Sequence, residues 1–600
     1  MGPAFTSSFR LGLLCLVVLA AFGGIGTRLY MLHVVEAGEL STIIEQNRQQ
    51  IVVNPARRGN IIDSKGNILA TTRSEIVLGV DPQVIREEDR EKWPELAKLT
   101  GVPLAEIERL MNHRQRPGRS GFPEDVQLIR WNKIREGFSE EEYQEILQLG
   151  IRGVYGNRQF NRFYPGGETA AHLVGYVNRE ESAVTGVERA MDFYLRGQDG
   201  WLESERDGRR QELAQFRSRE VRASDGLHVQ LTLDVVVQHM VEEELRRLVE
   251  EFDPQGATII VSEPETGYIL GLGNYPTYDL NEYNKVPLEN QRNRAVTDVL
   301  EPGSTFKIVP VAGALNERLV REDTVFDRNI TRIPVGDRMV PLPRDHRPYG
   351  ELTVGEIVMK SSNIGVAHLG VALGSHRLRK YAADFGFGES TGFLIGGEVS
   401  GTLHEVRNWD GLTITRLPMG HAVSATPLQI HSAMGAVANS GILMRPQVVR
   451  RALNNDGETV VSFPPVAKRR VISTPVARKL SGMLVNVTGP EGTASRAAIP
   501  GFQVAGKTGT TQKIVNGRYS NRHHVASFTG FFPASQPRVI ITVIVDEPKG
   551  PSAYGGIVAA PAFQRIGEKL IQYLGIAPVS EEEPYLALEG RSHDSAGSGL

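Results

Sequence analysis

The 600-residue sequence predicts an α/β protein of the α+β type, in which a central antiparallel sheet packs between helices. Residues Val235–Phe252 read as an amphipathic helix that follows a strand of alternating apolar residues. Residues 257–273 indicate a hairpin about a Pro-Glu-Thr-Gly turn, and Ala526–Phe532 with Val539–Asp546 indicate another. Because strands flank a helical middle, we expect distant segments to build one sheet within residues 226–575.

The remaining segments predict one more long helix, an N-terminal module and a tail. Thr426 is a good N-cap with proline after it, so a helix should begin there and end near residues 439–441. Residues 45–225 are polar, arginine-rich and broken by glycines, which predicts a pedestal of short strands and loops. Residues 576–600 hold a run of glutamates and close in SAGSGL, which predicts a disordered tail.

Composition excludes several kinds of site and partner. The 67 Lys and Arg residues nearly balance 70 Asp and Glu residues, so no basic footprint for nucleic acid is present. Cys15 is the one cysteine of the sequence. An intramolecular disulfide, a thiolate zinc cluster and an iron–sulfur site are therefore excluded.

The N-terminus predicts a membrane anchor. Leu11–Thr27 is a run of seventeen uncharged residues between two arginines, and its extension to residues 11–35 reaches spanning length. A cleaved signal peptide is the alternative, since Val18-Leu19-Ala20 ends in a small residue that a signal peptidase accepts. We expect the anchor to be retained, with residues 1–10 as a cytoplasmic stub, because the apolar run continues past that position.

Ser304 and Lys307 stand three residues apart, directly after a Pro-Gly break. The position is near a predicted helix N-terminus, where the helix dipole favours developing negative charge. Taken alone, this stretch favours an N-cap serine with a surface lysine behind it. Pro310 follows inside the same predicted helix, which it should kink or loosen by leaving the carbonyl of Phe306 without its usual partner.

Two further motifs favour catalysis instead. Ser361-Ser362-Asn363 is the one S-x-N of the sequence, and Lys507-Thr508-Gly509 is the one K-T-G. With the serine–lysine pair first and K-T-G just before a C-terminal hairpin, the order matches the signature of penicillin-binding proteins and class A β-lactamases.

The residue types suit proton transfer to and from a serine nucleophile. Lys307 can take the proton of Ser304 only as a neutral amine, which requires a strongly lowered pKa. Burial and a second cation, Lys507, would lower it. We expect Ser361 to pass the proton to the leaving amine and Asn363 to orient Lys307 and the substrate.

The K-T-G strand is expected to hold the substrate. Thr508 and Thr510, with Gly509 between them, would bind the terminal carboxylate of a peptide. The backbone N–H groups of Ser304 and Thr510 would form the oxyanion hole.

Other candidate sites are weaker. His523 and His524 lack the spacing of a metal site, so we expect them in a loop between strands. Asp546 and Glu547 end a predicted strand, where we expect them to be solvated.

The sequence resembles the class B penicillin-binding proteins, and within them the septal (cell-division) peptidoglycan D,D-transpeptidases of the FtsI family. The similarity covers nearly the whole chain. Its motifs are RGNIIDSKGNILA (58–70), RFYPGGETAAHLVGYV (162–177), GVERAMDFYLRGQDG (186–200), NRAVTDVLEPGSTFK (293–307), GKTGTTQK (506–513) and AYGGIVAAPAF (553–563).

The resemblance implies the penicillin-recognising transpeptidase fold behind a pedestal or dimerisation-like domain and a single membrane helix. It implies a penicillin-sensitive serine enzyme without cofactor or metal, in the cytoplasmic membrane with its catalytic domain in the periplasm. The implied substrates are peptidoglycan stem peptides ending in D-Ala-D-Ala, and the implied inhibitors are β-lactam antibiotics. A multi-spanning glycan polymerase of the septal FtsW type and divisome regulators are the implied partners, and nucleic acid is not.

Other functions share this active-site signature. An elongation-type transpeptidase is one alternative. A β-lactamase or carboxypeptidase would resolve the same acyl-enzyme with water, but the sequence lacks the E-x-x-L-N segment of class A deacylation. A β-lactam receptor or a structural divisome scaffold is a third alternative. Such a receptor would need cytoplasmic machinery, for which about ten residues before the anchor leave little room.

Overall fold

The computed structural model describes residues 8–38, 49–117, 126–206, 212–213, 219–327, 330–347 and 349–578. The chain divides into two compact units, one of residues 1–58 with 196–226 and the other of residues 59–195 with 227–600. The predicted pedestal, residues 45–225, therefore contributes to both units. Most of the predicted stub and tail, residues 1–7 and 579–600, lies outside the described residues.

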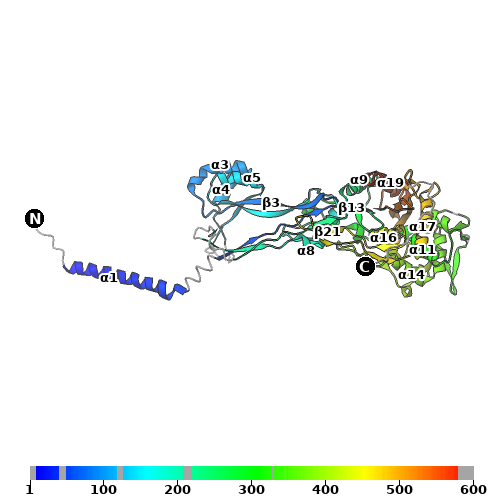
Figure 1. Ribbon diagram of the computed structural model, residues 1–600, viewed down its shortest axis with the longest axis horizontal. Helices are drawn as coiled ribbons and strands as arrows, with labels where there is room; N and C mark the ends of the chain where they lie inside the picture. Colours follow the sequence, from blue (N-terminus) through cyan, green and yellow to red (C-terminus); the bar gives the residue numbers. More distant parts are fainter. Residues whose placement is uncertain are drawn as a thin grey trace, which may run out of the picture. The chain divides into compact units, whose positions relative to one another are not determined.

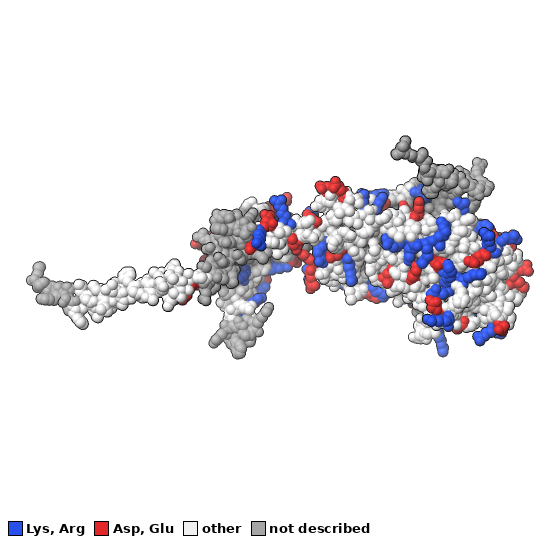
Figure 2. Space-filling model, turned by 60° about the horizontal axis from the view of Figure 1, so that its bottom comes forward, with Lys and Arg blue, Asp and Glu red and all other residues white. Residues whose placement is uncertain are grey.

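The first unit contains the anchor helix and a small sheet. Helix α1 (Ser8–Tyr30) continues into a π-helical turn, Met31–Val35. Residues 11–35 have a mean hydropathy of 1.9 and bury none of it inside the structure, as suits a candidate membrane span. Figure 2 shows an uncharged surface along most of this helix. The sheet pairs β8 (Gly200–Arg206) with β1 (Gln49–Asn54), β9 (Glu212–Leu213) and β10 (Arg219–Val221), all antiparallel.

The second unit contains the predicted antiparallel sheet, labelled in part in Figure 1. Its strand order is β13 (Ile269–Tyr275), β12 (Gly256–Ser262), β26 (Val539–Asp546), β25 (Arg518–Phe532) and β24 (Ala505–Val515). All seven residues of β12 are buried, which requires cover on both faces of the sheet. The fold class and the assembly from distant segments are confirmed, and β24, which carries the K-T-G motif, is an edge strand.

Helices supply that cover. Helix α9 (Val235–Phe252) packs on β12 and β13 and against α19 (Ala560–Leu574), while α16 (Pro427–Ala438) packs on β25 and β26. The predicted N-cap is confirmed, because Thr426 Oγ1 accepts a hydrogen bond of 3.2 Å from the Gln429 N–H in a capping box. The predicted catalytic half, residues 226–575, also contains the helices α11 (Ile308–Asn316), α12 (Val354–Met359), α13 (Asn363–Leu373), α14 (Ser375–Asp384) and α17 (Thr474–Thr488).

One expectation about the second hairpin is wrong. His523 and His524 lie within β25, which begins at Arg518 and not at Ala526, and His524 is paired with Gln512 of β24. The hairpin arms extend past the core of the sheet, so these strand residues are polar and carry no apolar alternation that would predict them.

A second sheet joins pedestal segments to the catalytic half. Strand β11 (His228–Leu231) pairs in parallel with β2 (Ile61–Ile62) and antiparallel with β21 (Val449–Leu453), which continues to β22 (Thr459–Ser462). On the other side β2 leads to β3 (Ile68–Val80), which also pairs with β6 (Asn132–Phe138) and β7 (Val154–Phe163). Within the second unit, this sheet therefore joins the pedestal strands β2, β3, β6 and β7 to the strands β11, β21 and β22 of the catalytic half.

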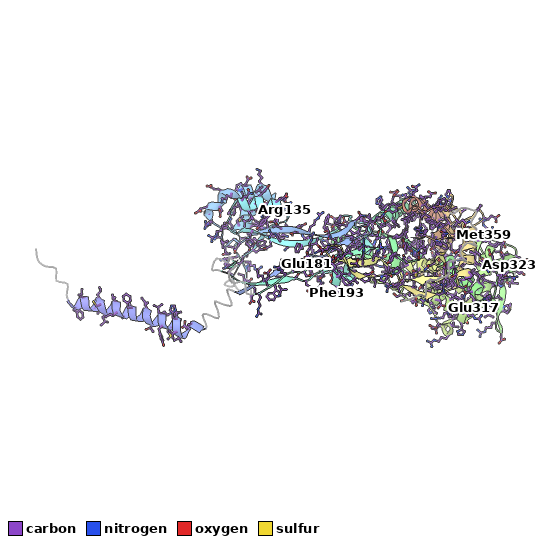
Figure 3. All side chains as sticks on the ribbon, viewed as in Figure 1. Arg135, Glu181, Phe193, Glu317, Asp323 and Met359 are labelled. Carbon is purple, nitrogen blue, oxygen red and sulfur yellow. The ribbon has the colours of Figure 1, made fainter. Side chains whose placement is uncertain are left out.

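Side chains lock the pedestal internally. Its longer helices are α3 (Trp93–Thr100), α4 (Leu104–Asn112) and α5 (Glu140–Gln148). Arg135 of β6, labelled in Figure 3, donates to the Thr100 carbonyl at the end of α3, at 2.6 Å. Arg162 of β7 forms a buried ion pair of 2.6 Å with Glu188. Arg162 also donates to the Gly59 carbonyl, which ties β7 to the segment before β2.

Candidate active site

Ser304 lies in a 3₁₀ turn, Gly303–Lys307, that runs directly into α11. In a 3₁₀ helix, residues three apart eclipse one another, so this turn places Ser304 and Lys307 on one face. The N-cap of the turn is Pro302, which has no capping side chain, and therefore the N-cap interpretation of Ser304 is wrong. Pro310 is the third residue of α11, in the first turn, where backbone N–H groups lack intrahelical partners, and this explains why the helix tolerates it.

Glycines allow the Gly303–Lys307 turn to lie close to its neighbours. Gly303 has φ +55°, and a Cβ there would lie 2.3 Å from Oγ1 of Thr511 on β24. On the other side, a Cβ on Gly420, which has φ +85°, would lie 2.0 Å from the Gly303 carbonyl oxygen. The turn is therefore held between the edge strand and the loop that contains Gly420.

Lys307 is buried and fully engaged. Its Nζ lies 2.6 Å from the Ser361 carbonyl oxygen, 2.7 Å from Oδ1 of Asn363 and 3.1 Å from Oγ of Ser361. Burial first, and the nearby charge of Lys507 second, hold the pKa of Lys307 well below its ordinary value, against the opposing charge of Asp345. A neutral Lys307 amine can donate its two protons to the Ser361 carbonyl oxygen and to Oδ1 of Asn363, which can only accept. Its lone pair can then accept a hydrogen bond from a hydroxyl group.

Ser361 connects the two lysines. Its Oγ lies 3.1 Å from Nζ of Lys307 and 3.0 Å from Nζ of Lys507. Burial lowers the pKa of Lys507 to about 7. Ser361 has φ +59°, a left-handed conformation that costs an L-residue about 1–2 kcal/mol and persists when its surroundings impose it.

Asp345 organises this corner and was missed from the sequence. Its carboxylate accepts from the Ser362 hydroxyl at 2.8 Å and from the N–H of Asn363 at 2.5 Å. Ser362 in turn accepts from the Gly365 N–H at 3.0 Å and caps α13. No local motif marks Asp345, because it comes from a separate loop that only the fold brings beside S-x-N.

The K-T-G strand presents its residues along the edge of the sheet. Thr508 shares a hydrogen bond of 2.9 Å with Thr493, and Oγ1 of Thr510 accepts from the Gly555 N–H at 3.0 Å. A Cβ on Gly509 would lie 2.3 Å from Oγ of Ser527, so this position has no room for a side chain. Because β24 is an edge strand, its outer backbone groups can pair with an extended peptide.

The other candidate residues lie apart from this cluster. Asp546 and Glu547 are not simply solvated: Lys513 lies 2.9 Å from Asp546 and 2.6 Å from Glu547. His523 Nδ1 lies 2.7 Å from Glu547. No group of three His, Cys, Asp or Glu residues that could hold a metal ion occurs among the residues that the structure describes.

Comparison with known proteins gives two family matches. Residues 257–568 match the penicillin binding protein transpeptidase domain, and residues 53–231 match the penicillin-binding protein dimerisation domain. The first match contains all the motif residues that surround Lys307.

Individual proteins match over most of the chain. Stage V sporulation protein D of Bacillus subtilis is 31% identical over 92% of this chain and 84% of its own length. Peptidoglycan D,D-transpeptidase FtsI of Escherichia coli is 29% identical over 95% of this chain and 93% of its own. The crystal structure of penicillin binding protein 3 from Mycobacterium tuberculosis, complexed with ampicillin, superposes with a TM-score of 0.67 at 26% identity, covering 89% of this chain and 99% of that one.

The backbone of Ser361 leads to a first prediction. Ser361→Gly and Ser361→Ala both remove the hydroxyl, but only glycine adopts a positive φ without steric cost. We expect the glycine variant to be the more stable by about 1 kcal/mol in urea denaturation. Equal stabilities, or a more stable alanine variant, would show that the left-handed conformation is not imposed on the native protein.

Proposed function

The chain belongs to the class B penicillin-binding proteins, a family of peptidoglycan D,D-transpeptidases, and from this premise we propose that Ser304 is the nucleophile of a septal transpeptidase. The observation that carries the proposal is the position of Ser361 Oγ between two buried lysines, 3.1 Å from Lys307 and 3.0 Å from Lys507. Such an arrangement can take a proton from one oxygen and deliver it to a leaving nitrogen.

The proposed acylation begins with Lys307. Lys307, neutral because it is buried beside Lys507, takes the hydroxyl proton of Ser304. The Ser304 oxygen bonds to the carbonyl carbon of the penultimate D-alanine of a stem peptide, and the bond from that carbon to the terminal D-alanine nitrogen breaks. Ser361 relays a proton to this nitrogen. Free D-alanine leaves, and the rest of the stem stays on Ser304 as an ester.

Cross-linking reverses the proton path. An amine of a neighbouring stem attacks the ester carbonyl, the carbon–oxygen bond to Ser304 breaks, and the amine proton returns through Lys307 to the Ser304 oxygen. Asn363 keeps Lys307 in place through its 2.7 Å contact. A water molecule in place of the amine would give hydrolysis instead, as in a carboxypeptidase.

Substrate and inhibitor binding are assigned to the edge of β24. We assign Thr508 and Thr510 to the terminal carboxylate of the peptide and Gly509 to the close approach of its backbone. The N–H groups of Ser304 and Thr510 are assigned to the oxyanion. A β-lactam would acylate Ser304 by the same steps, and its opened ring would remain attached.

The septal role and its partners are the finer part of the proposal. FtsI, a relative named as a peptidoglycan D,D-transpeptidase, aligns with 95% of this chain. We propose that residues 11–35 anchor the protein in the cytoplasmic membrane with the catalytic domain in the periplasm, where its substrate lies. We further propose that this helix and the pedestal, residues 45–225, bind a multi-spanning glycan polymerase of the FtsW type and divisome regulators.

Acylation by benzylpenicillin tests the nucleophile. We expect the full chain, purified in detergent, to gain the mass of one penicillin on the peptide that contains Ser304. Ser304→Ala should gain none, while Ser473→Ala, a matched change at the N-cap of α17 where the side chain makes no capping bond, should react like the unchanged protein. Penicillin bound covalently to Ser304→Ala would refute the assignment.

The pH dependence of acylation tests the base. Only neutral Lys307 can take the proton, so the rate should fall as pH drops through the pKa of Lys307. The charge of Asp345 raises that pKa, and its removal in Asp345→Asn should lower the pKa and move the acid limb of the profile to lower pH.

The control for this profile is Asp323→Asn, which neutralises an exposed carboxylate labelled in Figure 3 and should leave the limb in place. Stopped-flow measurements of the acylation rate from about pH 4 to about pH 9 give the profile of each variant. A limb that moves to higher pH in Asp345→Asn would contradict the role of Lys307.

Charge reversal in the pedestal tests the partners. Lys98→Glu, Arg109→Glu and Lys133→Glu change exposed residues whose ion pairs are screened by solvent and contribute little to stability. We expect some of them to reduce co-purification of the polymerase and septal localisation several-fold, with penicillin acylation retained. Arg321→Glu, at an exposed residue outside the pedestal, is the control. A panel without effect on either readout would remove the docking proposal.

A further inference from the structure

A pocket of about 520 Å³ lies beside the nucleophile turn and has no part in the steps above. Its walls come from the first residues of β12, the segment that leads from α10 (Arg294–Thr297) to Glu301, and the far part of β24. Leu300, Val525 and Ile544 supply an apolar floor, and charged residues surround it.

The pocket is continuous in structure with the catalytic machinery. Glu301 stands three residues before Ser304, separated from it by Pro302 and Gly303. Thr511 lines the pocket and directly follows Thr510 on β24, and Gly303 packs against Thr511. A peptide that lies along β24 with its reactive carbonyl at Ser304 would therefore bring a neighbouring residue to this pocket.

The cations of the pocket already have carboxylate partners. Each lies within 3.0 Å of an acid other than Glu301. The pairs are Arg292–Glu289 (2.8 Å), Arg294–Asp298 (2.8 Å) and Lys513–Glu547 (2.6 Å). An anionic ligand would have to compete with these carboxylates, so the pocket does not favour one.

Glu301 differs from the other acids. Its Oε1 accepts from the N–H of Ala422 at 3.1 Å and from the hydroxyl of Tyr519 at 3.2 Å, which fixes the carboxylate. Among the residues that the structure describes, its ion-pair contact is His421, at 3.4 Å from Oε2. Burial above all lowers the pKa of His421 to about 4, so this imidazole is neutral at neutral pH.

The carboxylate of Glu301 is thus oriented, mostly buried and uncompensated. Its side chain is 15% exposed, and Oε2, which is itself shielded from solvent, has no hydrogen-bond donor in the described part of the chain. Burial raises the pKa of Glu301. A buried carboxylate of this kind forms its strongest hydrogen bond with a charged donor, because a nearby cation offsets the solvation that the carboxylate lost on burial.

We propose that this pocket binds the side-chain ammonium of the diamino acid that precedes the acylated D-alanine in the donor stem, with Glu301 as its counter-ion. The proposal rests on the proposed function, which places a stem peptide on Ser304. The donor stem fits better than the acceptor stem, because an amine paired with a carboxylate keeps its proton and cannot attack the ester.

The experiment compares two donors on the full chain in detergent. Both are Nα-acetyl-lysyl-D-alanyl thioesters of thioglycolate, one with a free side-chain amine and one with that amine acetylated. Ser304 attacks the thioester carbonyl and thioglycolate leaves as the thiol, so release of the thiol measures acylation. We expect the free amine to raise kcat/KM at least about tenfold over the acetylated donor, the size of one charge-assisted hydrogen bond.

Variants locate the effect. In Glu301→Gln, which keeps the shape of the side chain, the ratio between the donors should fall to within about twofold. Glu282→Gln, which breaks an exposed pair with Lys285 outside the pocket, should keep the ratio of the unchanged protein. Equal rates for the two donors on the unchanged protein, or a ratio that survives Glu301→Gln, would overturn the proposal.

The test separates this inference from the proposed function. Penicillin carries no lysine amine, so its covalent attachment to Ser304 reports on the nucleophile alone. If penicillin attaches and the donors do not differ, only the pocket assignment fails. If neither penicillin nor a thioester attaches to Ser304, the proposed function fails.

Discussion

The catalytic half of the molecule depends on keeping one lysine amine out of water. Lys307 is 1% exposed, and its Nζ contacts the oxygens of Ser361 and Asn363. Dehydration of an ammonium is costly, and in proteins the group then loses its proton instead. The 3₁₀ turn that ends at Lys307, the segment from Ser361 into α13 and the edge strand β24 with Lys507 must therefore be packed together before the amine is dehydrated.

This dependence gives the buried polar groups around the site a common purpose. Lys507 adds a second buried amine, and Asp345 orients the two residues after Ser361 while opposing the pKa shift of Lys307. Moving any of these groups changes both the geometry and the electrostatics, because the same atoms make the contacts and carry the charge. The site is better viewed as one hydrogen-bonded network than as a set of separate catalytic residues.

Local sequence patterns were sufficient for much of the fold. The amphipathic stripe of Val235–Phe252, the capping threonine before α16 and the two apolar hairpins were all predicted, since each depends on neighbours within a few residues. The motifs also identified the residues that meet at Ser361. Three long-range contacts were not predicted from the sequence. They are the pairing of β11 with β2 and β21, the contact of Asp345 with Asn363, and the contact of the Glu301 carboxylate with His421. These depend on segments that only the folded chain brings together.

The two glycines at the turn that carries Ser304 restrict which variants of the protein can keep this turn intact. A Cβ at Gly420 would reach within 2.0 Å of the backbone at Gly303, and Gly303 itself is limited by Thr511. Any side chain at either position would therefore deform the turn that carries Ser304, so sequence variation that preserves this turn has to lie elsewhere in the chain.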